Sequence, residues 1–279
     1  MSAAATKPPR SAVLATFAHP DDEVLCAAGT LARCAAQGDD VTLVCATRGE
    51  YGPIASAELA TPETLAEVRE AELRASCAAL GVQRVELLGL PDGGVSWAAD
   101  EQQTLPELVR SIRQLRPRVL ITFGPDGLYG HTDHVAIGEL TTEARRLAAD
   151  PSYLVASTPG AVQPAPYHVP RLFFAVWTGE FVREMLDALA QTGQPAQLWS
   201  LQPEQFPLTS AAITASVDVS SVLEQKLRAL HSHRTQLTRD HALPLLSGEL
   251  AARFLGVEHF CCADGLAGDP VTYSRARED

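Results

Sequence analysis

The 279-residue sequence has no apolar run near the roughly 20 residues that a membrane-spanning helix needs. It also has no Lys- and Arg-rich stretch, and its formal net charge is −12. This acidic balance argues against nucleic acid or an anionic membrane as a partner. The apolar run after residues 1–10 is too short for a signal peptide, so we expect a disordered tail there and a cytoplasmic protein.

Several sequence signatures are missing as well. The six cysteines include no Cys-x-x-Cys pair, and most fall on apolar faces of predicted elements, as is typical of reduced core residues in the cytoplasm. Neither Gly-x-Gly-x-x-Gly after the first strand nor Gly-x-x-x-x-Gly-Lys-Ser/Thr is present, so both nucleotide-binding fingerprints are absent.

Strand and helix patterns alternate through the first 150 residues. The apolar periodicity predicts strands at 12–17, 40–46, 84–90 and 119–123, and helices at 24–37, 63–80, 101–116 and 133–149. This order predicts an α/β fold with a Rossmann-like, doubly wound and mostly parallel sheet.

The second half has fewer apolar elements. It predicts strands at 172–177, 215–219 and 257–263 and helices at 180–190 and 222–233. These are too few for an independent domain, so we expect a single domain over residues 1–279 in which they complete the fold. Residues 150–170 carry five prolines and predict a long loop.

Residues 18–23 (Ala-His-Pro-Asp-Asp-Glu) lie between the first strand and the following helix. In an open α/β sheet, ligands bind beyond the carboxyl ends of the strands. One imidazole and three carboxylates in five positions suit a divalent cation such as Zn²⁺. The alternative is a simple helix start, where acidic side chains complement the helix dipole.

A second polar cluster follows the strand at 119–123. His131 and His134 stand three residues apart where a loop enters a helix, so both can point the same way. Two clusters in matching positions favour a metal site over two helix caps. Three protein ligands would leave one position of a catalytic zinc open.

Taken in series, these motifs resemble the PIG-L/LmbE-like deacetylase family, which includes the N-acetylglucosaminyl-phosphatidylinositol, mycothiol and bacillithiol pathway deacetylases. The motifs span residues 18–23, 47–52, 69–72, 90–93 and 129–134, with a weaker one, Lys-x-x-Ala-Leu-x-x-His-x-x-Gln, at 226–236. The resemblance implies a zinc-dependent amide hydrolase that acts on N-acetylglucosamine-type sugars.

The resemblance also implies a metal site and a base. Carried over position by position, His19, Asp22 and His134 would bind the metal. Asp21 would act as the general base on the attacking water. Zinc is the default ion, although Fe²⁺, Co²⁺ or another divalent metal suits the same ligands.

Further roles follow from the same motifs. His131 would stabilise the oxyanion or act as an acid, with Tyr129 assisting. Arg69 and Asp92 would hold sugar hydroxyls, whereas the residues alone suggest a solvated helix face for Arg69 and a turn for Asp92. The sequence departs from many relatives at Thr132, where they have proline.

We therefore expect a zinc-dependent N-deacetylase whose partner is a small N-acetylated amino sugar, such as an intermediate of a bacterial thiol cofactor or a related glycoside. A homo-oligomer is compatible with the sequence. The alternatives are a thiol-conjugate amidase with the same site, and a catalytically silent sugar-binding protein. A two-metal phosphoesterase would need more ligands than these clusters supply.

Overall fold

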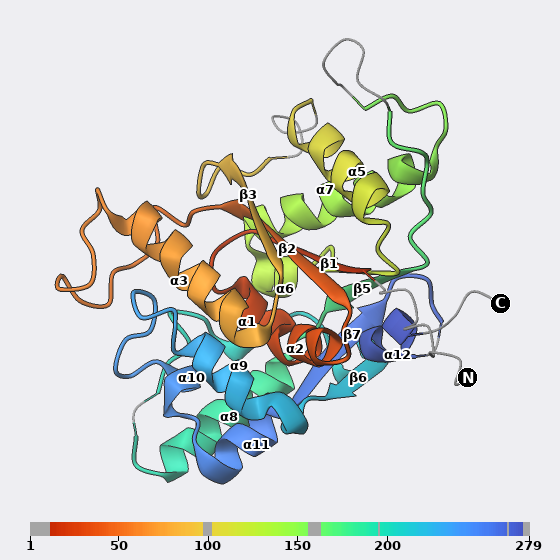
Figure 1. The fold of residues 1–279 in the computed structure, drawn as a ribbon. Helices are drawn as coiled ribbons and strands as arrows, with labels where there is room; N and C mark the ends of the chain where they lie inside the picture. Colours follow the sequence, from red (N-terminus) through yellow and green to blue (C-terminus); the bar gives the residue numbers. More distant parts are fainter. Residues whose placement is uncertain (1–11, 97–101, 156–162, 195, 267, 276–279) are drawn as a thin grey trace, which may run out of the picture.

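The computed structural model describes residues 12–96, 102–155, 163–194, 196–266 and 268–275. Within them, seven strands form one sheet in the order β3-β2-β1-β4-β5-β7-β6 (Figure 1). The strands are β1 (Ala12–Phe17), β2 (Asp40–Thr47), β3 (Arg84–Leu90), β4 (Val119–Phe123), β5 (Arg171–Ala175), β6 (Ala215–Asp218) and β7 (Val257–Cys262). The first five are parallel, and β7 pairs antiparallel with β5 and β6. The predicted doubly wound, mostly parallel sheet is confirmed.

Helices cover both faces of this sheet. They are α1 (Asp22–Cys26), α2 (Ala28–Ala36), α3 (Leu65–Leu80), α5 (Thr104–Leu115), α6 (Gly127–Gly130), α7 (Thr132–Ala149), α8 (Gly179–Gln191), α9 (Leu223–Leu230), α10 (Ala242–Leu245), α11 (Gly248–Leu255) and α12 (Pro270–Arg275). In Figure 1, α5 and α7 lie together on one side of the sheet, and α2, α3 and α9 lie on the other. Three short 3₁₀ turns, η1 (Pro203–Gln205), η2 (Ser210–Ala212) and η3 (Ser220–Val222), join the later elements.

The two central strands, β1 and β4, are almost entirely buried. Their continuous apolar sequences are typical of parallel strands covered by helices on both faces. Strand order reverses between them, because the chain goes from β1 outward to β2 and β3 and returns to β4 on the other side. The crevice at such a switch point is where open α/β sheets bind ligands, and both polar clusters follow these two strands.

The predicted helix at 24–37 is two helices in the structure. Ala27 leaves the helical conformation (φ −153°), and α2 starts anew behind it. Two N–H groups in the first turn of α2, on Gly29 and Thr30, each donate to the Glu258 carboxylate at 2.8 Å. Because this anionic cap comes from β7, more than two hundred residues away, the local periodicity of 24–37 carries no sign of the break.

Other differences are smaller. The short helices α10, α11 and α12 were not predicted, because segments of four to eight residues show too little periodicity. The described parts of the predicted loop, 150–155 and 163–170, contain no helix or strand. The predicted tail at 1–10 lies outside the described residues.

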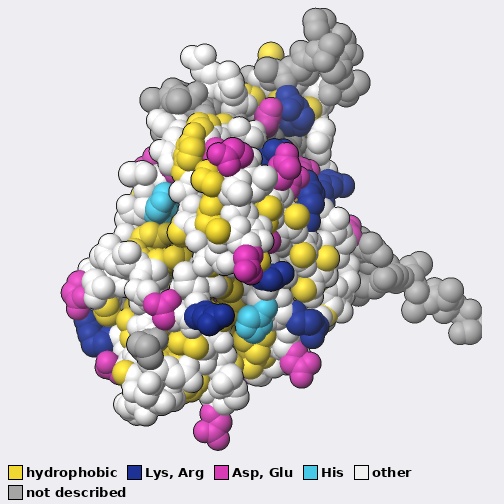
Figure 2. All heavy atoms as spheres, turned by 90° about the vertical axis from the view of Figure 1, so that its left-hand side faces the viewer, with side chains coloured by type: hydrophobic (Ala, Val, Ile, Leu, Met, Phe, Trp, Pro, Cys, Tyr) yellow, Lys and Arg dark blue, Asp and Glu magenta, His cyan; other side chains and the backbone are white. Residues whose placement is uncertain are grey.

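One face of the molecule, seen in Figure 2, carries Lys and Arg side chains interspersed with Asp and Glu side chains, so charge of neither sign gathers on it. None of the helices in the described part of the chain combines the length and apolar character that crossing a bilayer requires.

Candidate metal centre and active site

The turn after β1 fixes two adjacent carboxylates in different directions. Asp22 Oδ2 accepts the backbone N–H groups of Ala18 (3.1 Å) and His19 (2.7 Å), which locks this carboxylate at the end of β1. Asp21 has φ 118°, in the left-handed region that side chains other than glycine rarely adopt. Strained backbone of this kind is concentrated at functional sites. Here, Asp22 faces two histidines while Asp21 faces Arg69.

The second cluster follows β4. The chain turns through α6 and enters α7, whose N-cap is His131; His131 Nδ1 accepts the N–H of Asp133 at 3.2 Å. The His134 ring stacks on Phe123 with centroids 3.9 Å apart. His134 Nδ1 lies 3.1 Å from the carbonyl oxygen of Gly127, which can only accept, so Nδ1 carries a proton and Nε2 presents a lone pair.

Three potential ligand side chains converge where the clusters meet. His134 Nε2 lies 3.2 Å from His19 Nδ1 and 3.2 Å from Asp22 Oδ1, and His19 Nδ1 lies 3.5 Å from Asp22 Oδ2. The other His19 nitrogen, Nε2, faces the carboxylates of Asp133 (3.2 Å) and Asp92 (3.3 Å) and therefore carries a proton. In the neutral rings two lone pairs thus face each other, and a cation relieves this repulsion.

The distances fit zinc. Ligands held about 2.0–2.2 Å from a tetrahedral Zn²⁺ lie about 3.3–3.6 Å from one another, close to the 3.2 Å between the two imidazole nitrogens and to the 3.2 and 3.5 Å from these nitrogens to the two oxygens of Asp22. The carboxylates behind His19 are the partners that orient a metal-ligating histidine. These three side chains therefore suit a divalent ion and leave a fourth position open.

Among the described residues, two groupings bring one ligand atom from each side chain within 4.8 Å of one another, namely His19–His131–His134 and His19–Asp92–Asp133, whereas Asp22 contacts the two imidazoles through different oxygens. The second would have to use His19 Nε2, which already donates to those carboxylates. In the first, His131 replaces Asp22, although Asp22 is the residue in direct contact with both imidazoles. We therefore favour His19, Asp22 and His134.

Charge in the cluster also points to a cation. Burial lowers the pKa of His19, but hydrogen bonds with Asp133, Asp22 and Asp92 outweigh burial and hold this pKa well above its usual value. Burial raises the pKa of Asp22, but positive charge on His134 and the hydrogen bonds that His134 and His19 donate when both of their ring nitrogens are protonated hold it well below its usual value. The surroundings thus favour positive charge between these side chains.

Asp21 stands beside the donor atoms with its own partner. Arg69 Nη2 donates to Asp21 Oδ2 at 3.1 Å and to the Pro20 carbonyl at 2.6 Å, and Nη1 donates to the Gly49 carbonyl at 2.8 Å. Burial raises the pKa of Asp21 to about 6, although the positive charge of Arg69 lowers it. A carboxylate with a pKa near neutrality can both take up a proton and return it.

His131 and Tyr129 also border the cluster. The His131 and His19 ring centroids are 4.8 Å apart, and the Tyr129 ring lies 5.1 Å from that of His134. Burial, together with the charges of His134 and His19, lowers the pKa of His131. A neutral ring whose Nδ1 accepts from Asp133 carries its proton on Nε2, as a donor. Burial raises the pKa of Tyr129, so its phenol stays protonated.

The two predicted sugar-binding residues lie next to this cluster. Asp92 follows β3; its Oδ1 faces His19, and its Oδ2 accepts the N–H of Tyr51 at 2.8 Å. Arg69 is 4% exposed, and its recorded hydrogen bonds are to Asp21 and backbone carbonyls rather than toward solvent. The structure brings both residues to the site, and their binding of a sugar stays a prediction.

No role was predicted for His233 from the sequence. The structure places His233 Nε2 2.6 Å from Glu23 Oε1, in a fully buried contact across 210 residues of sequence. The available signal was the weak motif at 226–236, which contains this histidine.

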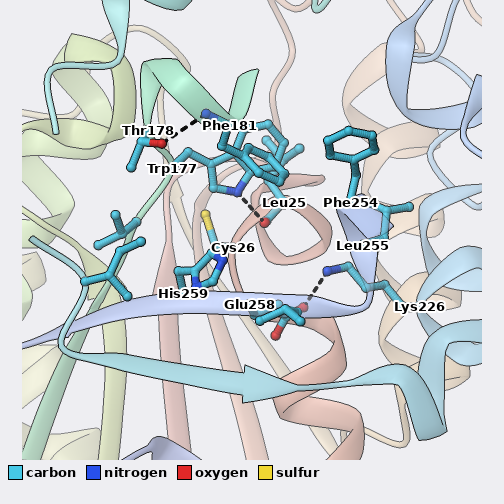
Figure 3. A pocket seen from close by; sticks show the side chains of 13 residues that line it. Leu25, Cys26, Trp177, Thr178, Phe181, Lys226, Phe254, Leu255, Glu258 and His259 are labelled. Atoms are coloured by element: carbon cyan, nitrogen blue, oxygen red, sulfur yellow. Dashed lines mark hydrogen bonds and ion pairs between the residues drawn. The ribbon is translucent and has the colours of Figure 1, made fainter. Parts of the chain in front are cut away.

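A cavity of about 80 Å³ lies on another side of α1. Figure 3 shows Trp177 and Phe254 around it and the Lys226–Glu258 ion pair (2.7 Å) along its base. Trp177 Nε1 donates to the carbonyl of Leu25 at 3.1 Å. None of its lining residues belongs to the metal or catalytic set, and a buried ion pair of this kind favours water in such a space.

Comparison with known proteins adds to this picture. A family model described as GlcNAc-PI de-N-acetylase matches residues 14–145, which include His19, Asp22, His134, most of β1 and all of β4. A protein of Thermobispora bispora named 1D-myo-inositol 2-acetamido-2-deoxy-alpha-D-glucopyranoside deacetylase is 34% identical over 280 residues, covering 93% of this chain and 90% of that protein.

Solved structures show the same fold. The N,N'-diacetylchitobiose deacetylase from Pyrococcus horikoshii matches with a TM-score of 0.65 and 20% identity, over 92% of this chain and 85% of that one. GalB, the 4-carboxy-2-hydroxymuconate hydratase from Pseudomonas putida KT2440, matches with a TM-score of 0.63 and 22% identity, over 93% and 98%. Because these two proteins carry different reaction names, the fold alone does not decide the chemistry.

Proposed function

Since this chain belongs to the GlcNAc-PI de-N-acetylase family, we propose that it removes the acetyl group from the amino sugar of an N-acetylglucosamine-type glycoside. Relatives named as 1D-myo-inositol 2-acetamido-2-deoxy-alpha-D-glucopyranoside deacetylases are 34% identical to it over more than nine-tenths of the chain. This likeness favours an inositol glycoside, as in mycothiol-type cofactor synthesis, or a similarly small substrate.

The observation that carries the proposal is the convergence of His19, Asp22 and His134, whose side chains approach one another at 3.2–3.5 Å, with the carboxylate of Asp21 held separately beside them. These three residues would hold a divalent ion, and the distances fit zinc. When bound, such an ion would polarise the acetamide carbonyl and make a water more acidic.

The remaining residues would move protons and bind developing charge. Asp21 would take a proton as the water oxygen attacks the carbonyl carbon, and it would return that proton to nitrogen as the C–N bond breaks, which yields acetate and the free amine. His131 Nε2–H would donate to the oxyanion, with the protonated Tyr129 nearby. Arg69 would keep Asp21 in place, and Asp92 would contact a sugar hydroxyl.

The test is amine release from 1D-myo-inositol 2-acetamido-2-deoxy-alpha-D-glucopyranoside and a panel of N-acetylglucosaminides. Protein stripped with a chelator should lose activity and regain it on reloading with Zn²⁺, Fe²⁺ or Co²⁺. Metal analysis should find one divalent ion per chain, and His134→Ala should lose it because one of three ligands is gone. His231→Ala, at an exposed histidine, is the matched control.

Two outcomes would contradict the proposal. Full metal occupancy in His134→Ala would reject the ligand set. Binding of several acetylated sugars without amine release from any of them would favour the sugar-binding alternative.

A further inference from the structure

The segment 231–236 lies against the catalytic turn although it is far away in sequence. His233 contacts Glu23 of α1, Thr235 donates to Glu72 of α3 through its N–H (2.9 Å) and its hydroxyl (2.6 Å), and Gln236 Nε2 donates to the Pro53 carbonyl at 2.9 Å. The segment that carries His233 is therefore held in place by hydrogen bonds to helix α3 and to the loop after β2.

Glu23 links this segment to the catalytic turn. Its Oε1 accepts from the Ser76 hydroxyl at 2.5 Å and faces His233 Nε2 at 2.6 Å, while its Oε2 accepts the backbone N–H of Asp21 at 3.1 Å. Glu23 and His233 are both fully buried. Because bulk solvent does not reach either side chain, the three donors set the orientation of the carboxylate.

The third of those donors belongs to the residue with the strained backbone. Asp21 adopts φ 118°, and such a conformation persists only where the surroundings hold it. The N–H bond to Glu23 restrains the backbone of Asp21, and Arg69 restrains its side chain. Ser76 and Arg69 both lie on α3, so one helix carries a partner for each restraint.

We propose that His233 is a positioning residue for the deacetylation reaction. Acting through Glu23, it holds the Asp21 backbone in the conformation that keeps the Asp21 carboxylate beside the three metal-binding residues. The inference rests on the proposed function for its catalytic consequence. Its structural part, the restraint on the Asp21 backbone, is independent of what the substrate is.

A purely packing role for His233 makes a different prediction. If only volume mattered, a leucine of similar size would serve about as well as any polar residue. If the bond to Glu23 matters, glutamine, whose terminal amide N–H can replace a ring N–H, should serve better than leucine.

The experiment compares His233→Leu, His233→Gln and the exposed-site control His231→Leu in the metal-loaded, full-length protein. The substrate probe is 1D-myo-inositol 2-acetamido-2-deoxy-alpha-D-glucopyranoside. We expect His233→Leu to lower kcat by about 10–10²-fold, because small misplacements of reacting groups have effects of this size. KM and metal content should change less than about twofold, and His233→Gln should recover most of kcat.

A second readout needs no turnover. Hydrogen–deuterium exchange in the peptide over residues 18–26 should become faster at the Asp21 amide in His233→Leu, because the Glu23 carboxylate loses a partner that orients it. Exchange in His231→Leu should match that of the wild type. If the wild-type protein releases no amine from any acetylated sugar, the proposed function fails, while this measurement still tests the restraint.

Equal kcat losses in the Leu and Gln variants, a loss confined to KM or metal content, or unchanged Asp21 exchange would overturn the proposal. Should His233→Leu fail to fold, Glu23→Gln takes its place. Because donors face both oxygens of the carboxylate, the NH₂ group of the introduced amide must meet a donor on one side. This variant should therefore reproduce the kcat loss and the faster exchange, and wild-type behaviour in it would also overturn the proposal.

Discussion

Asp21 and Asp22 are adjacent in the chain, yet their surroundings set opposite protonation behaviour. Two imidazoles keep the pKa of Asp22 low although burial raises it, whereas burial dominates at Asp21 and raises its pKa to about 6. The strained φ of Asp21 separates the two side chains. One carboxylate is thereby suited to bind a cation and the other to exchange a proton.

Replacing Asp21 tests this division of roles. Asp21→Asn keeps the size of the side chain and removes the proton acceptor, so turnover should fall about 10²–10⁴-fold while metal stays bound. Steady-state kinetics and metal analysis on the same preparation measure both quantities. Turnover like that of the wild type would remove Asp21 as the base and make His131 the leading candidate.

Much of the candidate site was predictable at this scale, because its side chains follow two adjacent parallel strands. His19, Asp22 and His134 meet for that reason. The role of Arg69 was less accessible, since helix periodicity cannot reveal that it bonds to carbonyls 20 and 49 residues earlier in the chain. His233 is the extreme case, with 210 residues between it and Glu23.

At the scale of elements, the start of α2 depends on a side chain from the far end of the chain. Glu258 accepts from two N–H groups of α2 and pairs with Lys226 of α9 at 2.7 Å, and both charged side chains are nearly fully buried. This carboxylate joins β7, α2 and α9. The helices packed on one face of the sheet are thus tied to its antiparallel edge.

Removing the cation of this pair should destabilise the fold strongly. Lys226→Met leaves Glu258 buried without its ion-pair partner, and breaking such a pair costs about 3–5 kcal/mol. Urea denaturation followed by circular dichroism measures the free energy of unfolding. As a control, Arg183→Ala disrupts the exposed Arg183–Glu204 pair (2.8 Å) and should change this free energy by less than about 1 kcal/mol. A change of similar size in both variants would contradict the argument.

The order of elements along the chain was largely predictable, because strands such as β1 and β4 have strong apolar runs bounded by polar residues and Gly or Pro. The position of β7, which is inserted antiparallel between β5 and β6, could not be predicted from the sequence. Strand pairing depends on contacts between segments distant in sequence, and the short exposed–buried alternation of β6 indicates a strand without naming its neighbour.

At the scale of the whole molecule, a buried histidine should make stability depend on acidity. His241 caps α10, where its Nδ1 accepts the N–H of Leu243, and its Nε2 is buried without a recorded partner. Burial lowers the pKa of His241 from 6.5 to about 4, against the nearby charge of Asp240, which raises it. Between these pH values the unfolded chain binds a proton that the folded protein does not.

The free energy of unfolding should therefore fall as the pH drops from about 6.5 to 4, and this group's part of the fall is at most about 3 kcal/mol. His241→Gln removes the titrating group, so its free energy of unfolding should decline less over the same range. Urea titrations at several pH values measure the difference, with the exposed-site variant His231→Gln as control. Parallel pH profiles for wild type and His241→Gln would show that His241 does not cause the decline.

The contact between His233 and Glu23 has a consequence for the protein during its synthesis. A ribosome makes a chain from its N-terminus, so all three proposed metal-binding residues are present once residue 134 has been added, while His233 is added about a hundred residues later. A nascent chain can thus offer a complete set of metal-binding side chains before the turn that bears Asp21 acquires its last restraint. We expect ion capture to precede catalytic competence, which makes translation itself a delay between the two.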